Sequence, residues 1–307
     1  MVTFRGEAES EAMRAVIAVC SNKGGVGKTT VATNLAIYLR ALHEDLPVLL
    51  VGLDDQSIIE RMFRLQPRQP GEGNLKHAFA EHSLERVIQT GQYGVQFVPP
   101  PPDVELLKAR CDDPSLLRRM LDRLDFPGVA IVDTKGDLEA LTRSALHAAD
   151  LAILPVSDWA SLEEAAKVLG LLERTPLGDD RGRILLTLVD RRTRIDDSGR
   201  DLYERLVAAI DERGWHRFGA YLSRSPRVEA LNSATQNPGS ILHHARGTQV
   251  YTQMRALAEE VMAAIDPEGT LAGVRSEPAP APLPEESGAP FGGLKRALLR
   301  GLGQGRR

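Results

Sequence analysis

The segment from Ser21 to Thr30, SNKGGVGKTT, constrains the fold of this chain more than any other. It follows a short apolar run, Ala15 to Cys20, and precedes a stretch with helical spacing from Val31 to Leu42. This order predicts a strand, a glycine turn and a helix N-terminus in succession. Its three glycines allow backbone N–H groups to close around a polyphosphate, and the helix dipole adds positive potential there. The segment therefore predicts a phosphate-binding loop.

Two side chains of this loop predict the chemistry of the site. Lys28 is placed to neutralise the β- and γ-phosphates, and the Thr29 hydroxyl is placed to bind Mg²⁺. The predicted ligands are therefore ATP and Mg²⁺. A glycine-rich turn that binds nothing is disfavoured, because strand, lysine, hydroxyl and helix are all in register.

The loop departs from the ordinary phosphate-binding form, since Asn22 stands where that form has glycine and Lys23 is an additional lysine. In this respect the sequence KGGVGKTT resembles the deviant P-loop of the ParA/MinD positioning ATPases. The resemblance implies that Lys23 reaches the ATP of a partner in a nucleotide-sandwich homodimer. The residues expected to surround the nucleotide are Lys23, Gly24, Gly25, Val26, Gly27, Lys28, Thr29 and Thr30.

Composition limits the class of protein. A net charge of −4 gives no global attraction to nucleic acid, so DNA contact would need a local basic patch. The two cysteines, Cys20 and Cys111, have no metal-binding or redox spacing. Residues 1–14 form a short acidic extension without an apolar core, and no segment reaches the roughly 18 apolar residues of a membrane span. We expect a cytoplasmic, nucleoid-associated or peripherally membrane-associated protein.

A second apolar run, Pro47 to Leu53, ends in polar residues and is predicted to be a buried parallel strand. Parallel sheets bind ligands at the carboxyl ends of their strands, which places Asp54 beside the loop. A carboxylate there can orient the attacking water or hold Mg²⁺ through a water. The resembling family usually has Asp-x-Asp-Pro-Gln, whereas Gly52 and Asp55 replace the first aspartate and the proline. This departure implies slow or altered hydrolysis.

A third apolar run, Val129 to Val132, ends in Asp133 and is followed by Thr134, Lys135 and Gly136. An aspartate at this place suits the Mg²⁺ side of a nucleotide site. It matches the Asp-Thr or Asp-Ser of the resembling family. Asp137 is interpreted as the N-cap of a following helix, Leu138 to His147, with a role as an acid near the metal as the alternative.

The remaining sequence to residue 266 alternates apolar runs with amphipathic stretches, which predicts an α/β fold of three layers. A mostly parallel twisted sheet has helices on both faces in this fold, and residues 15–266 form the ATPase domain. The predicted strands are 95–98, 151–156, 184–189 and 218–223, and the predicted helices 74–87, 103–124, 161–173, 198–213 and 247–265. Residues 58–102 are the least regular part, either a variable flank that meets a partner or plain scaffold. The resemblance implies that the loop containing Pro226 contacts adenine.

Two basic features compete as the surface on which such an ATPase works. One is a group of arginines that could contact DNA phosphates without reading sequence, or could simply be solvated. Its members are Arg191, Arg192, Arg194, Arg224 and Arg227.

The other basic feature lies beyond a linker, residues 267–290, that is rich in proline, alanine and glutamate and is expected to be disordered. At ~100° per residue, residues 291–307 form a short basic amphipathic helix that would bind a membrane surface or a partner. Its contacting residues would be Phe291, Leu294, Lys295, Leu298 and Leu302. This tail resembles the membrane-targeting helix of MinD proteins, although its glycines also allow a disordered basic tail.

These features predict an ATPase of the ParA/MinD type that positions cellular cargo by cycling between an ATP-bound dimer and a monomer. Hydrolysis would be slow and stimulated by a partner protein. The alternative is a nucleotide-gated adaptor that scarcely hydrolyses ATP. Iron–sulfur carriers of the same class are excluded because their paired cysteines are absent, and cobyrinate-type amidoligases remain a remote option.

Overall fold

The computed structural model describes residues 15–54, 57–64, 73–98, 100, 113–175, 178, 180–192, 199–233 and 238–269. The N-terminal extension, Arg194, almost all of the linker and the basic tail lie outside these residues, and so do Cys111, Asp55 and Gln56. Among the described helices, none is long and apolar enough to cross a membrane.

A seven-stranded sheet in the order β3-β4-β2-β5-β1-β6-β7 organises the described residues. All neighbouring strands are parallel except β3 and β4, which are antiparallel. The strands are β1 Ala15–Val19, β2 Val48–Gly52, β3 Gln89–Thr90, β4 Gln96–Val98, β5 Val129–Asp133, β6 Leu151–Val156 and β7 Gly182–Leu186. The central strands are buried along their whole length, as continuous apolar runs require.

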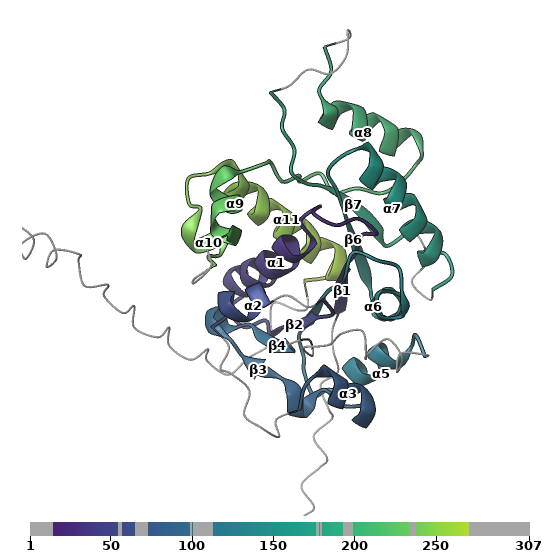
Figure 1. The fold of residues 1–307 in the computed structure, drawn as a ribbon, viewed down its shortest axis with the longest axis vertical. Helices are drawn as coiled ribbons and strands as arrows, with labels where there is room; N and C mark the ends of the chain where they lie inside the picture. Colours follow the sequence, from purple (N-terminus) through teal and green to yellow (C-terminus); the bar gives the residue numbers. More distant parts are fainter. Residues whose placement is uncertain are drawn as a thin grey trace, which may run out of the picture.

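Helices cover both faces of the sheet (Figure 1). Their bounds are α1 Lys28–Leu42, α2 Ser57–Met62, α3 Leu75–Glu81, α5 Leu116–Asp122, α6 Ala140–Ala148, α7 Trp159–Leu172, α8 Leu202–Glu212, α9 Pro226–Ser233, α10 Ile241–His244 and α11 Gln249–Ile265. Two short 3₁₀ helices, Glu85–Val87 and Gln92–Gly94, flank β3.

Alternate residues of every strand except β3 enter two separate cores. Val16 and Ala18 of β1 belong to the core shared with α3, α5, α6, α7 and α8, whereas Ile17 and Val19 pack with α1, α10 and α11. This alternation gives the three layers expected from the sequence and confirms the predicted fold class of the described domain.

The predicted helix over residues 74–87 is wrong in its second half. The helix α3 ends at Glu81, because His82 adopts a left-handed conformation with φ 55° and donates its N–H to the carbonyl of Ala78. Leu84 and Val87 are buried and so continue the apolar spacing, although the chain there is a 3₁₀ helix. Periodicity alone could not separate the two.

The predicted strand over residues 218–223 is also wrong. This segment runs beside β7 and is joined to its neighbourhood by isolated bridges, Ile184 to Arg217 and Val189 to Ser223. The N–H groups of Gly219 and Ala220 instead donate to the carboxylate of Glu260 on α11, at 2.8 and 2.7 Å. A ladder cannot form where a side chain takes the backbone donors.

Several other boundaries shift. The strand predicted to end at Val189 ends at Leu186, and Leu188 is left-handed with φ 53°. The helices expected to begin at Ser161 and Ser198 begin at Trp159 and Leu202, after the capping boxes of Asp158 and Asp201. Of the helix predicted over residues 103–124, the described part contains α5.

Candidate nucleotide-binding site

The predicted site residues gather at the carboxyl edge of the sheet. The phosphate-binding loop connects β1 to α1, Asp54 follows β2, and Asp133 ends β5, the strand between β1 and β2. The topology therefore brings together groups that are more than 100 residues apart in the chain, as expected for a parallel sheet.

The loop itself is an open cradle. Gly25 and Gly27 adopt φ values of 76° and 90°, a region that disfavours any residue with a Cβ atom. A Cβ atom built at Gly24, Gly25 or Gly27 would meet no other atom within 4 Å, so the space above the loop is free. Backbone N–H groups can line such a space and bind an anion.

Lys28 occupies the first turn of α1, and only 7% of it is exposed. Its Nζ donates to the backbone carbonyl of Lys23 at 3.0 Å, which holds the ammonium group over the loop. Gly136 lies close to this ammonium group: a Cβ atom added at Gly136 would lie 3.2 Å from Nζ of Lys28. A side chain at position 136 would therefore crowd the lysine.

Hydroxyl groups fasten the loop to the sheet. Thr187, just beyond β7, donates from Oγ1 to the carbonyl of Val26 at 2.8 Å. Thr134 donates from Oγ1 to the carbonyl of Val19 at 3.0 Å. Both threonines are buried, so these bonds satisfy polar groups that water does not reach.

Lys23 is held within its own chain. Its Nζ lies 2.6 and 2.8 Å from the two carboxylate oxygens of Asp158, the N-cap of α7. Partial burial raises the pKa of Asp158, but hydrogen bonds from Lys23 and Ser161 outweigh it, so the net pKa is lowered. Asn22 adds a second contact to α7 by donating to Glu164. Asn22 and Lys23, the two residues that depart from the ordinary phosphate-binding loop, therefore bind the loop to the N-terminal part of α7.

Asp133 is fully buried, and neither carboxylate oxygen has a hydrogen-bond partner of normal geometry within the described residues. Its pKa is raised to about 7, chiefly by burial; the nearby Thr29 hydroxyl and Lys28 oppose the increase, and the charge of Asp54 adds to it. An unpaired buried carboxylate is costly by itself, and a cation with its water ligands would satisfy it. Asp133, Thr29 and Asp54 therefore fit a Mg²⁺ site beside the cradle.

The replacement of Asp133 by asparagine is expected to stabilise the nucleotide-free protein above pH 7, by at least ~1 kcal/mol. The folded pKa of about 7 exceeds the ordinary value of 3.8, so the native state binds the extra proton between these values. Wild-type stability should thus fall as pH rises from about 4 to 7, and the advantage of the variant should shrink as pH falls. Urea unfolding at pH 5 and pH 8 measures this difference, and an equal or lower stability of the variant at pH 8 would contradict it.

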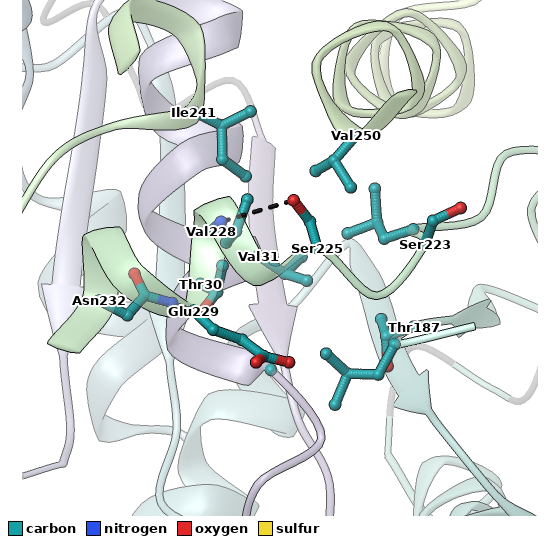
Figure 2. Close-up of a pocket in the computed structure, with 13 residues that line it drawn as sticks. Thr30, Val31, Thr187, Ser223, Ser225, Val228, Glu229, Asn232, Ile241 and Val250 are labelled. Atoms are coloured by element: carbon teal, nitrogen blue, oxygen red, sulfur yellow. Dashed lines mark hydrogen bonds between the residues drawn. The ribbon is translucent and has the colours of Figure 1, made fainter. Parts of the chain in front are cut away.

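A small cavity lies next to the loop, between α1, the end of β7 and α9 (Figure 2). In this view Ile241 and Val250 gather at one end, and Thr187 and Glu229 lie toward the other. Its lining residues are Gly27, Thr30, Val31, Thr187, Leu188, Leu222, Ser223, Ser225, Val228, Glu229, Asn232, Ile241 and Val250. Pro226, the predicted adenine contact, is exposed at the start of α9 and lies between two lining residues. The apolar lining with a few hydroxyl and amide groups suits a nucleobase.

Asn232 joins this cavity to the loop. Its Nδ2 donates to Oγ1 of Thr30 at 3.1 Å, although it belongs to α9, a helix with no fully buried residue. No motif in the sequence identifies Asn232, and it was not predicted. Asp158 was not predicted either, although it follows the apolar strand β6 as Asp54 follows β2.

The described arginines of the predicted DNA surface all bind groups of the same chain. Arg191 lies 2.9 Å from Asp201, Arg192 2.8 Å from Asp190, and Arg224 2.9 Å from Glu229. Arg227 donates to the carbonyl of His244 at 2.6 Å. Carboxylates therefore partly neutralise the charges of Arg191, Arg192 and Arg224, whereas Arg227 keeps its full charge.

Comparisons with known proteins agree with this geometry. The AAA_31 family, described as an AAA domain, matches residues 14–173. The chain is 32% identical over 259 residues to the chromosome-partitioning ATPase Soj of Thermus thermophilus, which covers 81% of this chain and 96% of that protein. The chain belongs to the ParA/MinD family of P-loop ATPases. Membership confirms the resemblance inferred from KGGVGKTT.

Solved structures share the fold of this ParA/MinD chain. The cobyrinic acid a,c-diamide synthase of Mycobacterium smegmatis, solved with an ATP analogue and magnesium, superposes with a TM-score of 0.63 at 20% identity and covers 82% of this chain and 95% of that one. The cell division ATPase MinD of Pyrococcus furiosus gives a TM-score of 0.63 at 21% identity. The superposition covers 81% of this chain and 98% of the MinD chain. Similarity at this level concerns the fold alone.

Proposed function

We propose that this chain binds ATP with Mg²⁺ at the carboxyl edge of the sheet and hydrolyses it as part of a positioning cycle. The observation that carries the proposal is the convergence of the open glycine cradle, the buried Lys28 and the unpaired carboxylate of Asp133. Anion-binding and cation-binding groups meet there, as a magnesium–triphosphate complex requires. Structures of this fold with a bound ATP analogue and magnesium support the choice of ligand.

Each residue has a distinct task in this proposal. Lys28 and the loop backbone bind the β- and γ-phosphates, and the cavity bounded by α9 receives the base beside Pro226. Thr29, Asp54 and Asp133 hold Mg²⁺, which neutralises phosphate charge when bound. Asp54 orients the attacking water at the γ-phosphate.

Lys23 completes the site of a second subunit in this proposal. Dimerisation requires its ammonium to leave Asp158 and reach the partner's phosphates, whereas Lys28 remains with its own nucleotide. Hydrolysis, stimulated by a partner protein, returns the chain to the monomer with Lys23 back on Asp158. Such a cycle would position a chromosome or plasmid locus, a division site or other cargo, in line with the chromosome-partitioning relative Soj and the cell division ATPase MinD.

The rate of ATP turnover separates this ATPase from the alternative, a nucleotide-gated adaptor that scarcely hydrolyses ATP. Gly52 bears on that rate. A Cβ atom at Gly52, where the family usually has aspartate, would lie 3.1 Å from Cδ of Pro100 and 3.5 Å from Cζ of Phe97. An aspartate would not fit without a shift of Pro100, so Asp54 acts without that neighbour and hydrolysis should be slow.

The replacement of Asp54 by alanine is expected to lower multiple-turnover phosphate release about a hundredfold or more while ATP still binds, because it removes the group that orients water. The matched control is Asp45→Ala, an exposed aspartate in the turn before β2. Wild-type protein that releases no more than one phosphate per chain, even with partner present, would instead favour the adaptor.

The surface on which the dimer works is tested with the same variant. Asp54→Ala protein with ATP and Mg²⁺ is sedimented with DNA and with anionic vesicles, with and without residues 291–307. Binding to DNA that survives removal of the tail would favour the arginine surface. Binding to vesicles that disappears with the tail would favour a membrane switch.

A further inference from the structure

Trp159, the first residue of α7, is a large apolar side chain at the surface. Among the described residues, two large hydrophobic residues are exposed to solvent: 42% of the surface of Trp159 is accessible, and 40% of that of Leu188. Leu188 lines the cavity proposed for the base, so a nucleotide would cover part of it. Trp159 does not line that cavity, and the proposed nucleotide site leaves it uncovered.

The position of Trp159 connects it to the phosphate-binding loop. It directly follows Asp158, whose carboxylate holds the ammonium group of Lys23 at 2.6 Å. The strand before it, β6, lies between β1, which leads into the loop, and β7, which leads to Leu188. Trp159 thus belongs to the face of the molecule that carries Lys23.

A cation neighbours the ring. The guanidinium carbon of Arg205 on α8 lies 5.7 Å from the ring centroid of Trp159, within the range of a cation–π contact. Tryptophan and arginine are the residue types most enriched among side chains that dominate binding energy at protein interfaces. A surface of this kind at the edge of a nucleotide site fits a protein partner.

We infer that Trp159 anchors the contact with a second copy of this chain. The inference rests on the proposed function, in which Lys23 reaches the partner's nucleotide. In an isologous dimer that brings Lys23 to the partner, the N-terminus of α7, which holds Lys23 through Asp158, lies near the interface, and the exposed Trp159 ring is the large apolar group available there. Burial of Trp159 then adds apolar contact to an interface otherwise built from phosphates and charges, and it occurs only when two ATP-bound chains meet.

Tryptophan fluorescence tests this directly, because the chain contains two tryptophans, Trp159 and Trp215. Trp215 packs partly against the core, so Trp215→Phe keeps an aromatic ring there and leaves Trp159 as the reporter. Acrylamide quenching is measured with Mg²⁺ and a non-hydrolysable ATP analogue over a range of protein concentrations, with light scattering on the same samples. We expect quenching to fall at least about twofold as the dimer forms.

Four outcomes are distinguished. If the protection of Trp159 from acrylamide quenching rises together with the amount of dimer seen by light scattering, the inference is supported. A dimer in which Trp159 remains fully quenchable overturns it while leaving the proposed function intact, and protection at concentrations where scattering shows monomers overturns it as well. The absence of any dimer while the analogue binds would contradict the proposed function itself.

Substitution supplies an independent measurement. Trp159→Ala is expected to raise the dimer dissociation constant at least about tenfold with ATP affinity of the monomer unchanged, as for an interface hot spot. Trp159→Phe should recover part of the loss. Trp215→Phe is the matched aromatic control, and an unchanged dissociation constant for Trp159→Ala would overturn the inference.

Discussion

Lys28→Ala protein is expected to bind ATP at least about a hundredfold more weakly than the unmodified chain. Charge-assisted hydrogen bonds are worth about 1.5–3 kcal/mol each, and an ammonium group shared between two phosphates makes at least two. Lys28 is almost fully buried and already aimed over the cradle by the carbonyl of Lys23, so its charge is preorganised. Isothermal titration with ATP and Mg²⁺ measures the loss.

The control for this prediction is Lys76→Ala, which removes a lysine from the first turn of α3. Thermal unfolding of both variants checks that the fold is kept. Tight ATP binding by folded Lys28→Ala protein would remove the assignment of the site, because no other residue of the loop carries the same charge into the cradle.

Lys23→Ala is expected to leave ATP binding by the monomer within about threefold of the unmodified protein, a change below ~1 kcal/mol, and to abolish ATP-dependent dimerisation. The Lys23 ammonium group points to Asp158 rather than over its own cradle, so its loss removes little from the chain's own nucleotide site. Sedimentation velocity at several protein concentrations with a non-hydrolysable ATP analogue measures the dimer.

The paired variant is Asp158→Asn. Asparagine remains a good N-cap for α7 but removes the charge that holds Lys23, so this variant should dimerise at least as readily as the unmodified chain. If Lys23→Ala dimerised normally, Lys23 would have no role in the partner's site. Weaker dimerisation of Asp158→Asn would mean that the ion pair supports the dimer instead of restraining it.

Much of the scaffold could be predicted from the sequence, because the central strands are continuous apolar runs that only a covered parallel sheet can bury. The same runs ended in Asp54 and Asp133, so the topology alone placed both carboxylates at one edge. The buried, unpaired state of Asp133 was not predictable, since it depends on how closely the neighbouring loops cover it.

Other features depend on contacts between distant residues that leave no local pattern. The carboxylate of Glu260 takes backbone donors from residues 219 and 220, which turns a predicted strand into a loop with isolated bridges. The pairing of Lys23 with Asp158 joins residues 135 positions apart, and neither sequence neighbourhood specifies the other. The interpretation of Asp137 as an N-cap was close but incorrect: Glu139 occupies that position, and Asp137 accepts the N–H of Glu139 at 3.1 Å.

We expect ATP binding, and not ADP binding, to bring two chains together. Sedimentation velocity of the unmodified chain, residues 1–307, with Mg²⁺ and either no nucleotide, ADP or a non-hydrolysable ATP analogue measures this. We expect a species of twice the monomer mass with the ATP analogue and monomers in the other two samples. The same mass in all three samples, with nucleotide binding verified on the same protein, would mean that ATP does not control dimerisation.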